Sequence, residues 1–310
     1  MNFIIKDIEE LRKEDHPMPP KFFLNYWHRG EISILGGDPN VGKSFLINDL
    51  CVGIYRGISF WGEPITEVRG RCFVVDLEMS DSMFGNRIKG APEGLFHDIT
   101  RISISLDNGD LDLSVEQLTA KLVEILKKYN GDKCVFIDNL TDLIGRRSKE
   151  KTAIELINRL RPLAERYNTS FLLVAHTIKR NPGKPITTND ICGSKAIIDA
   201  VDSVFVICES IKGEGICYVK HLKARFTSRY KEVAELELIE QPYLHFSLRD
   251  WNYEAEHLPA RRDRARKYSE SEIIEVVRLH TDGFSTREIQ DKTGVSKSTV
   301  ARIIKEYNSL

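Results

Sequence analysis

The chain has 310 residues, of which 41% are hydrophobic and 29% charged, and its formal net charge at pH 7 is -1. These proportions are those of an ordinary globular protein, and the length suits one large domain with a small one, or two medium ones. No apolar run approaches the roughly 20 residues of a membrane-spanning helix, so we expect no membrane contact. The near-neutral charge excludes a generally basic protein, so any nucleic-acid binding must come from local patches.

Six cysteines are scattered through apolar segments, and no two of them form a C-x-x-C pair. This distribution indicates small buried side chains in a reducing cytosol, and neither a zinc site nor a disulfide framework. The first residues lack the charged and then apolar layout of a signal peptide. We therefore expect a cytoplasmic protein.

A phosphate-binding motif follows the apolar run Ile32–Leu35, which predicts a strand. The pattern is G-x-x-x-x-G-K-[ST], from Gly37 to Ser44, and a helical pattern comes next. Glycines let successive N–H groups point at a β-phosphate, Lys43 brings a cation to the β- and γ-phosphates, and Ser44 supplies a hydroxyl ligand to Mg²⁺. The flanking elements disfavour a chance Gly-rich turn. The expected nucleotide-binding residues are Gly37, Asp38, Pro39, Asn40, Val41, Gly42, Lys43, Ser44 and Phe45.

Residues 30 to about 208 alternate strand-like and helix-like patterns, which is typical of an α/β fold with a parallel sheet between helices. The expected strands are Ile32–Leu35, Cys72–Leu77, Ile102–Leu106, Cys134–Ile137, Ser170–Ala175 and Ser203–Ile207. The expected helices are Lys43–Tyr55, Ser80–Lys89, Ser114–Tyr129, Lys151–Tyr167 and Ser194–Ala200. Three later runs, Cys217–Leu222, Val233–Ile239 and Tyr243–Leu248, predict antiparallel strands that extend the same sheet.

The C-terminal part of the chain changes texture. Residues 250–267 are charged and irregular, which indicates a solvated linker, and the basic run around Arg261 and Arg262 would also grip phosphates. Residues 268–310 predict a small all-α unit with two capping boxes, at Ser269 and at Ser285. Its last two helices are spaced as a helix-turn-helix. We therefore expect an ATPase domain over residues 1–249, the linker, and this unit.

Three residues at predicted strand ends are candidates for hydrolysis. Asp138 ends the apolar run Val135–Ile137, in the pattern of a Walker B strand, and would hold Mg²⁺ opposite Ser44. Glu78 follows the strand that ends near Leu77 and would deprotonate the attacking water, with Asp76 as its competitor for that role. His176 ends another strand and would contact the γ-phosphate, although a lone histidine is often structural.

This set resembles the RecA-type ATPase core, and within it the hexameric replicative helicases of the DnaB and plasmid RepA type. The resemblance covers roughly residues 15 to 248 and is carried by Val75–Met79, Val174–Lys179, Gly193–Asp202 and Lys223-Ala224-Arg225. It favours Glu78 over Asp76 as the catalytic carboxylate and implies a phosphate-sensing role for His176. Because only about thirty residues precede the first strand, the match is nearer the smaller RepA type.

The resemblance also implies an oligomer, a hexameric ring. Lys223 and Arg225 would form a K-x-R finger that reaches the γ-phosphate of the neighbouring subunit. A guanidinium supplied across an interface raises the rate of phosphoryl transfer by about 10³–10⁵ in other enzymes. The alternative is that both side chains lie on the solvent face of an edge strand.

Two sets of residues are candidates for DNA contacts. Lys179, Arg180 and Lys184 lie in a Pro/Gly-broken loop that would meet the phosphates of a single strand in a ring channel. The helix-turn-helix resembles the DNA-binding units of resolvases and invertases, which implies duplex contacts. Its expected contact residues are Lys297, Ser298, Thr299, Arg302 and Lys305. A surface loop and a three-helix protein-interaction module are the alternatives.

The sequence thus predicts a RecA-like ATPase that uses ATP and Mg²⁺ and moves on single-stranded DNA as a ring helicase, targeted to duplex DNA by its helix-turn-helix. Adenine specificity is implied by the family, and no N-K-x-D guanine pattern is present. Two alternatives remain open. One is an ATPase that acts on DNA as a switch or a recombinase-like filament without translocating, and the other is a transcriptional regulator that only senses the nucleotide.

Overall fold

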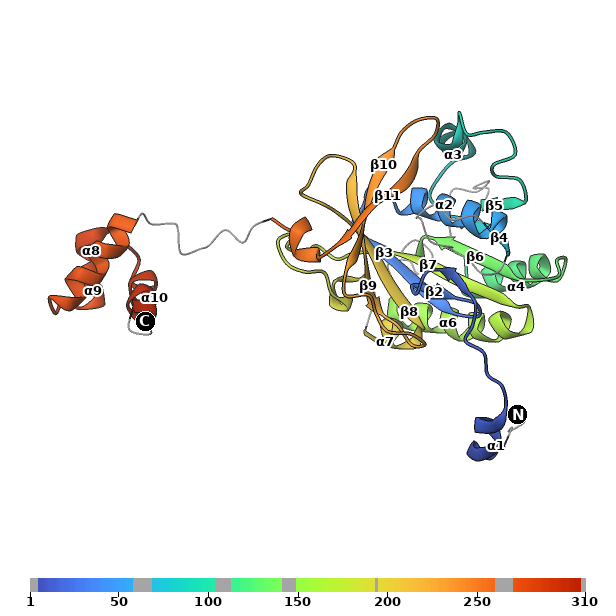
Figure 1. The fold of residues 1–310 in the computed structure, drawn as a ribbon, viewed down its shortest axis with the longest axis horizontal. Coiled ribbons are helices and arrows are strands. Elements are labelled where there is room, and N and C mark those ends of the chain that lie inside the picture. The colour runs from blue at the N-terminus through green and yellow to red at the C-terminus, as the bar shows by residue number, and fades with distance from the viewer. Residues whose placement is uncertain are drawn as a thin grey trace. The chain divides into compact units, whose positions relative to one another are not determined.

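The computed structural model describes residues 5–57, 69–103, 113–140, 149–192, 195–259 and 270–307. The chain divides into two units, Met1–Leu258 and Pro259–Leu310 (Figure 1). The first unit extends beyond the expected boundary at residue 249, because β11 (His245–Asn252) and the 3₁₀ helix η2 (Glu254–His257) pack onto it. The imidazole of His257 is buried there and stacks on Tyr218 with ring centroids 4.7 Å apart.

The described part of the first unit contains a nine-stranded sheet in the order β11-β10-β9-β8-β3-β7-β6-β4-β5. Its other strands are β3 (Ile32–Gly37), β4 (Arg71–Asp76), β5 (Ile99–Ser103), β6 (Lys133–Asp138), β7 (Thr169–His176), β8 (Ser203–Glu209), β9 (Ile216–Lys223) and β10 (Val233–Ile239). The strands from β8 to β5 pair in parallel, and β9, β10 and β11 pair antiparallel. The predicted α/β fold with an antiparallel extension is confirmed.

One expected strand differs in position. β5 begins at Ile99, earlier than the expected start at Ile102, and pairs with β4 from Cys72 onward. The sequence signal there was weak because β5 is an edge strand whose residues are only half buried. Residues 104–106, the rest of the expected strand, lie outside the described residues.

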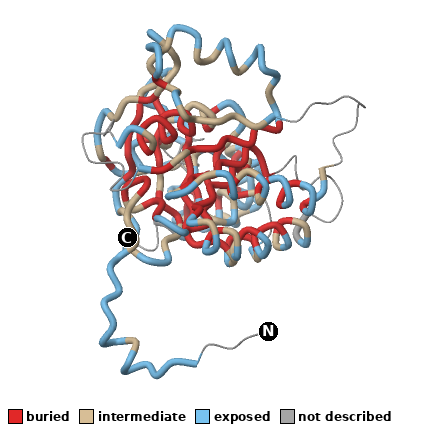
Figure 2. The backbone as a smooth tube through the Cα atoms, turned by 90° about the vertical axis from the view of Figure 1, so that its right-hand side faces the viewer, coloured by how far each residue is buried: buried red, intermediate tan, exposed pale blue. Residues whose placement is uncertain are grey.

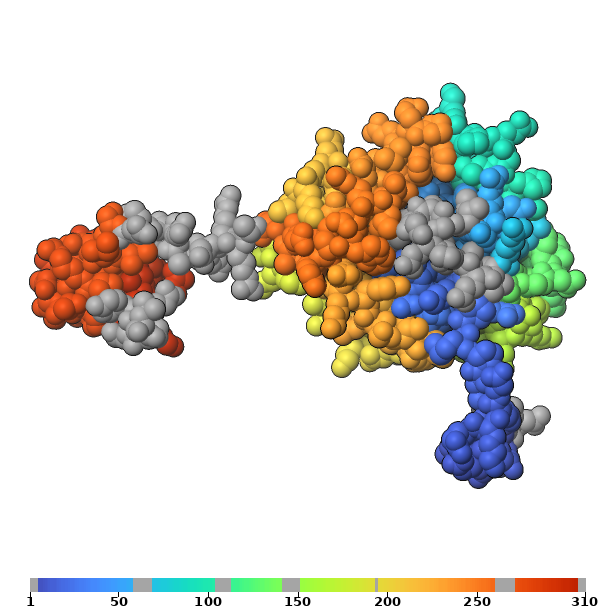
Figure 3. Space-filling model, viewed as in Figure 1, coloured from blue at the N-terminus to red at the C-terminus, as the bar shows by residue number. Residues whose placement is uncertain are grey.

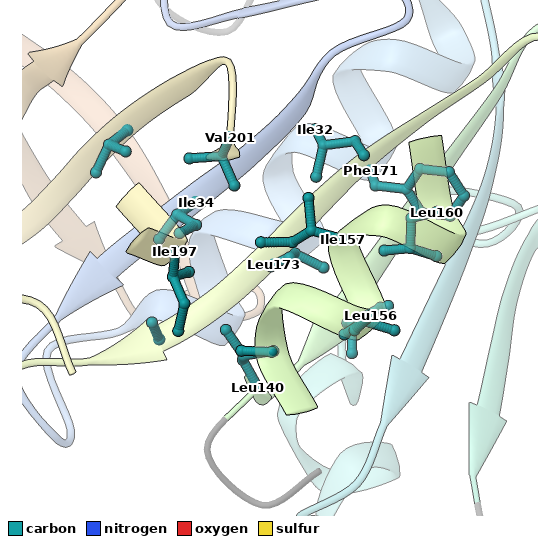
Figure 4. Packing of buried hydrophobic residues seen from close by; sticks show 14 of the residues in the cluster. Ile32, Ile34, Leu140, Leu156, Ile157, Leu160, Phe171, Leu173, Ile197 and Val201 are labelled. Atoms are coloured by element: carbon teal, nitrogen blue, oxygen red, sulfur yellow. The ribbon is translucent and has the colours of Figure 1, made fainter. Parts of the chain in front are cut away.

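Helices cover both faces of the sheet. The helices on one face are α4 (Val115–Leu126), α6 (Lys149–Arg166) and α7 (Lys195–Ala200), and α2 (Lys43–Arg56) covers the other. Ile32 and Ile34 of β3 point to the first face, where they meet Ile157 and Leu160 of α6 (Figure 4). Because successive strand residues alternate between faces, Leu35 joins the other core. Both faces are therefore buried, as the red tube of the sheet shows (Figure 2).

A short N-terminal hairpin, which the sequence did not indicate, closes the core on the α2 side. It consists of β1 (Lys21–Phe23) and β2 (Trp27–His28), and it follows a helix, α1 (Ile8–Lys13), that has no buried residue. The indole of Trp27 meets Phe136 edge-on at 5.4 Å, and Tyr26 stacks on Phe205 at 5.5 Å. Strands of two or three residues are too short for a periodic pattern, although the aromatic cluster was a signal of burial.

The turn between β10 and β11 lies against the segment that follows α3 (Asp81–Ile88). The two are drawn in orange and teal in the space-filling view (Figure 3). The rings of Phe96 and Tyr243 are 6.0 Å apart, and a side chain at Gly90 would collide with the carbonyl oxygen of Pro242. This contact ties the antiparallel strands to the α2 side of the sheet.

The second unit contains three described helices, α8 (Glu270–Thr281), α9 (Thr286–Thr293) and α10 (Lys297–Tyr307). The capping box at Ser285 is present, and Gly294 ends α9 with φ +71°. Val276, Ile289 and Val300 bring one residue from each helix into a common core. The predicted helix-turn-helix is confirmed, while Ser269 lies outside the described residues.

Candidate functional site

The phosphate-binding loop joins the central strand β3 to the N-terminus of α2. Gly42 adopts the left-handed conformation at the N-cap, with φ +92°, so that the loop can turn into the helix. The Lys43 ammonium donates to the carbonyl oxygens of Gly37 at 3.1 Å and Asp38 at 2.8 Å. Burial lowers the pKa of Lys43, and the nearby carboxylates of Asp138 and Glu78 oppose that shift. The loop is thus built to present backbone N–H groups and one cation.

Ser44 and Asp138 lie side by side at the start of α2 and the end of β6. The Ser44 hydroxyl donates to Oδ2 of Asp138 at 2.7 Å. Burial raises the pKa of Asp138, and this hydrogen bond opposes the shift. One hydroxyl and one carboxylate suit Mg²⁺, which takes oxygen ligands and completes its shell with phosphate and water. No described group of three or more His, Cys, Asp or Glu residues would hold a metal without such help.

The structure separates the roles of the two candidate carboxylates after β4. Asp76 is buried, and its Oδ1 accepts from the backbone N–H groups of Glu78 at 3.1 Å and Met79 at 3.0 Å. Its Oδ2 accepts from Nε of Arg101 at 3.0 Å. Asp76 therefore shapes the turn that carries Glu78. The Glu78 side chain is 39% exposed and faces His176, with Oε1 3.5 Å from Nε2.

Asn139 joins the site, although the sequence analysis did not single it out. Its Nδ2 donates to Oε1 of Glu78 and lies 3.1 Å from Nε2 of His176. Nδ1 of the same imidazole lies 3.3 Å from the Lys43 ammonium. The chain Lys43–His176–Asn139–Glu78 therefore connects the phosphate cradle with the carboxylate. Its one sequence signal was a polar amide next to Asp138 at a strand end.

The loop after β7 differs from the expectation at Arg180. This side chain is 8% exposed and pairs with Asp38 of the cradle, with Nη2 3.0 Å from Oδ2. It is held inward because Asp38 is the nearest carboxylate to a guanidinium that burial deprives of water, so Arg180 is not a DNA contact in this structure. Lys179 and Lys184 are exposed as expected.

The two predicted finger residues lie at the opposite edge of the sheet from the cradle. β9 runs antiparallel to β8, so that Lys223 pairs with Val204 near the start of β8. The ammonium of Lys223 donates to the carbonyl oxygens of Ile198, Asp199 and Val201 at 2.7, 3.1 and 2.7 Å. A lysine has three N–H donors, and all three are used here. Arg225 pairs with Asp202 at 2.7 Å.

A cavity of about 350 Å³ opens beside the cradle, between the start of α2 and the antiparallel strands. Val41, Phe45, Leu238 and Phe246 give it apolar walls. The backbone N–H of Phe246 donates to the buried Asp49 of α2 at 2.7 Å, which fixes the start of β11 on the helix. An apolar slot next to a phosphate cradle suits a nucleoside base.

The candidate duplex contacts lie on α10 of the second unit. Lys297, Ser298, Arg302 and Lys305 are exposed and Thr299 is half buried, while Val300, Ile303 and Ile304 fill the core. The expected linker contacts Arg261 and Arg262, and Gly193-Ser194 of the DnaB-like segment, lie outside the described residues.

Two family profiles match the chain. A profile described as an AAA domain covers residues 6–182, more than half of the chain, and a homeodomain-like profile covers residues 267–309. The chain therefore belongs to this AAA-domain family and carries a homeodomain-like, helix-turn-helix unit. No curated protein sequence gave a significant match.

Solved structures with the same fold include helicase ATPase domains. The ATPase domain of one DnaB-like helicase matches with TM-score 0.57 and 14% identity, over 72% of this chain and 86% of that one. A DnaB-like replicative helicase, solved for its interactions with primase, matches with TM-score 0.57 and 14% identity over 77% and 66%. A KaiC-like protein of Pyrococcus horikoshii OT3 matches with TM-score 0.50 and 16% identity over 72% and 91%. These likenesses establish the RecA-like fold.

Membrane insertion has no support in the described helices, none of which combines the length and the hydropathy of a span.

The cradle predicts a sharp effect of Gly42→Ala on nucleotide binding. The added Cβ would lie 2.7 Å from Cζ of Phe246, at a backbone position with φ +92°. We expect the affinity for a fluorescent ATP analogue to fall about tenfold or more. Gly131→Ala is the matched control, because its φ is +77° and no atom lies within 4 Å of the added Cβ. Wild-type affinity in Gly42→Ala would contradict this account of the loop.

Proposed function

We propose that the chain is an ATPase that hydrolyses ATP with Mg²⁺ and moves on single-stranded DNA as a RepA-like ring helicase. The observation that carries the ATPase assignment is the convergence of Lys43, Ser44, Asp138, Glu78 and His176 at one edge of a RecA-like sheet. These residues come from the ends of three separate strands and from one helix N-terminus. A purely structural arrangement gives no reason for a lysine, two carboxylates and an imidazole to meet at one edge.

Each residue has a distinct task in hydrolysis. The cradle N–H groups and Lys43 bind the β- and γ-phosphates, and Ser44 with Asp138 would hold Mg²⁺, which supplies charge stabilisation to the phosphates. Glu78 accepts the proton of the attacking water. Asn139 donates to Glu78 and so orients the carboxylate, and His176 lies between Asn139 and Lys43, where it contacts the γ-phosphate.

DNA contacts are assigned to two exposed basic regions. Lys179 and Lys184 lie in the loop that follows His176, so a change at the γ-phosphate has a direct covalent path to this loop. In a ring this loop would face the channel and contact the phosphates of one strand. The exposed face of α10 would contact a duplex, which places the motor near a specific site.

A second function is favoured by the helix-turn-helix itself. A homeodomain-like unit on an ATPase also suits a duplex-bound switch or recruiter, or a nucleotide-sensing regulator, that never translocates. ATP-dependent DNA binding without strand displacement by the wild-type chain would support this alternative against the helicase.

The hydrolytic role of Glu78 has a direct test. We expect Glu78→Gln to lower kcat by about 10²–10⁴, because the amide cannot accept the proton of the water. The affinity for ATP should stay near the wild-type value, since the cradle is intact. Glu124→Gln, at an exposed pair with Lys121 and Lys128 on α4, is the control and should leave kcat unchanged. Unchanged DNA-dependent turnover in Glu78→Gln would remove the assignment.

Assembly is tested by the ATPase rate at increasing protein concentration. If Arg225 completes the site of a neighbouring subunit, the rate per subunit rises with concentration and reaches a plateau once rings form. Single-stranded DNA should shift that rise to lower concentration. A rate per subunit that stays flat with concentration would contradict a finger supplied by a neighbour.

Duplex binding is tested at Lys297, which is exposed on α10. We expect Lys297→Ala to weaken binding to duplex DNA and to reduce the salt dependence by about one phosphate contact. ATP hydrolysis should not change, because the residue belongs to the second unit. Arg278→Ala on α8, where Arg278 pairs with Glu275 at 2.8 Å, is the control. Equal losses in the two variants would argue against α10 as the recognition helix. Both are measured by fluorescence anisotropy across a salt series.

A further inference from the structure

Asp202 holds two arginines at the edge of the sheet opposite the cradle. Its side chain is 3% exposed, and Oδ1 lies 2.7 Å from Nη1 of Arg225. The other oxygen, Oδ2, accepts from Nη1 of Arg161 on α6 and from the backbone N–H of Ile32 at 2.9 Å. The carboxylate is therefore fixed by the backbone of the central strand, and each of its oxygens carries one guanidinium.

The two arginines keep donors for a ligand. Arg225 uses one nitrogen on Asp202, and Arg161 uses Nη1 on Asp202 and Nη2 on the carbonyl oxygen of Ala200 at 2.9 Å. A guanidinium has five N–H donors, and these side chains are 40% and 49% exposed. Both line a cavity of about 560 Å³, together with Arg29 and Phe226.

The charge at this position favours an anion. Two guanidiniums share one carboxylate, which leaves one positive charge uncompensated beside the cavity. Arg29 adds no free charge, because it pairs with Asp132 at 2.7 Å. The forked geometry of arginine fits the oxygens of a phosphate. The cavity also contains one carboxylate outside this network, Glu165, which would oppose an anion at its own end.

The phosphate cannot be the one in the same chain's cradle. β3 runs from Ile32, beside Asp202, to Gly37 at the cradle. Five residues of parallel strand span about 17 Å, which is farther than an arginine side chain reaches. A phosphate at this cavity must therefore come from another molecule.

We propose that Arg161 and Arg225, held side by side by Asp202, bind the terminal phosphate of the ATP in a second copy of this chain. Arg161 then supplies the second positive charge of the finger, in place of Lys223, whose three donors are used on backbone carbonyls. In this arrangement Arg161 is a catalytic residue and Asp202 a positioning residue. The inference rests on the ATPase proposed above and adds a residue that no K-x-R pattern contains.

A subunit-mixing experiment tests it. Arg161→Ala alone should lower the ATPase rate by about 10²-fold, as the loss of one donor to a developing charge does elsewhere. Lys43→Ala subunits lack a working cradle but keep both arginines. An equal mixture of the two variants should recover about a quarter of the wild-type rate, because half of the cradles are intact and half of these meet an intact arginine pair.

Arg159→Ala is the matched control on the same helix. Arg159 is 41% exposed and pairs with Glu155 and Glu116, away from Asp202. It should keep the wild-type rate, and Arg161→Lys should recover part of it. Asp202→Asn should behave like Arg161→Ala and be rescued by Lys43→Ala subunits, which a folding defect would not be.

A second readout does not depend on turnover. In the Glu78→Gln background, ATP-dependent assembly is followed by sedimentation. Arg161→Ala should shift assembly to higher protein concentration, and Arg159→Ala should not.

The outcomes separate this inference from the proposed function. If mixtures of Arg225→Ala with Lys43→Ala recover activity while Arg161→Ala has the wild-type rate or is not rescued, the arginine pair is wrong and the ATPase stands. If no mixture recovers activity, the shared site itself is wrong. DNA backbone phosphate is the other source of the same chemistry. A loss of affinity for labelled oligo-dT in Arg161→Ala, with wild-type ATPase in the absence of DNA, would assign the cavity to DNA and overturn the neighbouring ATP.

Discussion

The parallel register of four neighbouring strands is the constraint on which the site depends. Gly37 of β3 pairs with His176 of β7, and Asp76 of β4 pairs with Asp138 of β6, so the strands end level with one another. Because side chains at the ends of parallel strands share one edge, residues that are up to 139 positions apart, such as Asp38 and Thr177, come into hydrogen-bond contact. A one-residue slip in any of these strands would turn its catalytic side chain into the core.

The sequence was informative wherever a local pattern carries the chemistry. The cradle has its own spacing, and Asp138, Glu78 and His176 each follow an apolar run, so their strand ends could be found without the fold. It was less informative for side chains whose partners are distant in sequence. Arg180 was expected to face DNA and instead pairs with Asp38, and nothing in the neighbourhood of Asn139 indicated Glu78 and His176 as its partners. Ion pairs and hydrogen bonds of this kind depend on burial, which a single sequence does not report.

The two edges of the sheet carry opposite halves of one reaction in the proposed assembly. The cradle edge gathers carboxylates and a phosphate-binding loop, and the other edge presents guanidiniums on Asp202. Two unlike surfaces that complement each other make a head-to-tail contact, which either closes into a ring or continues as a filament. The same chemistry therefore serves both the helicase and the filament alternatives, and the angle between successive subunits decides between them.

The β10–β11 extension gives the cradle a mechanical connection along the chain. β11 is anchored on α2 by Asp49, it places Phe246 over Gly42, and it continues through η2 to Leu258, where the second unit begins. A pull on the second unit, for example when it is bound to a duplex while the first unit is held elsewhere, is transmitted first to η2 and then to the strand that forms one wall of the base cavity. Nucleotide affinity in this chain is consequently sensitive to tension, with the hydrogen bond between Asp49 and Phe246 as the point that resists it.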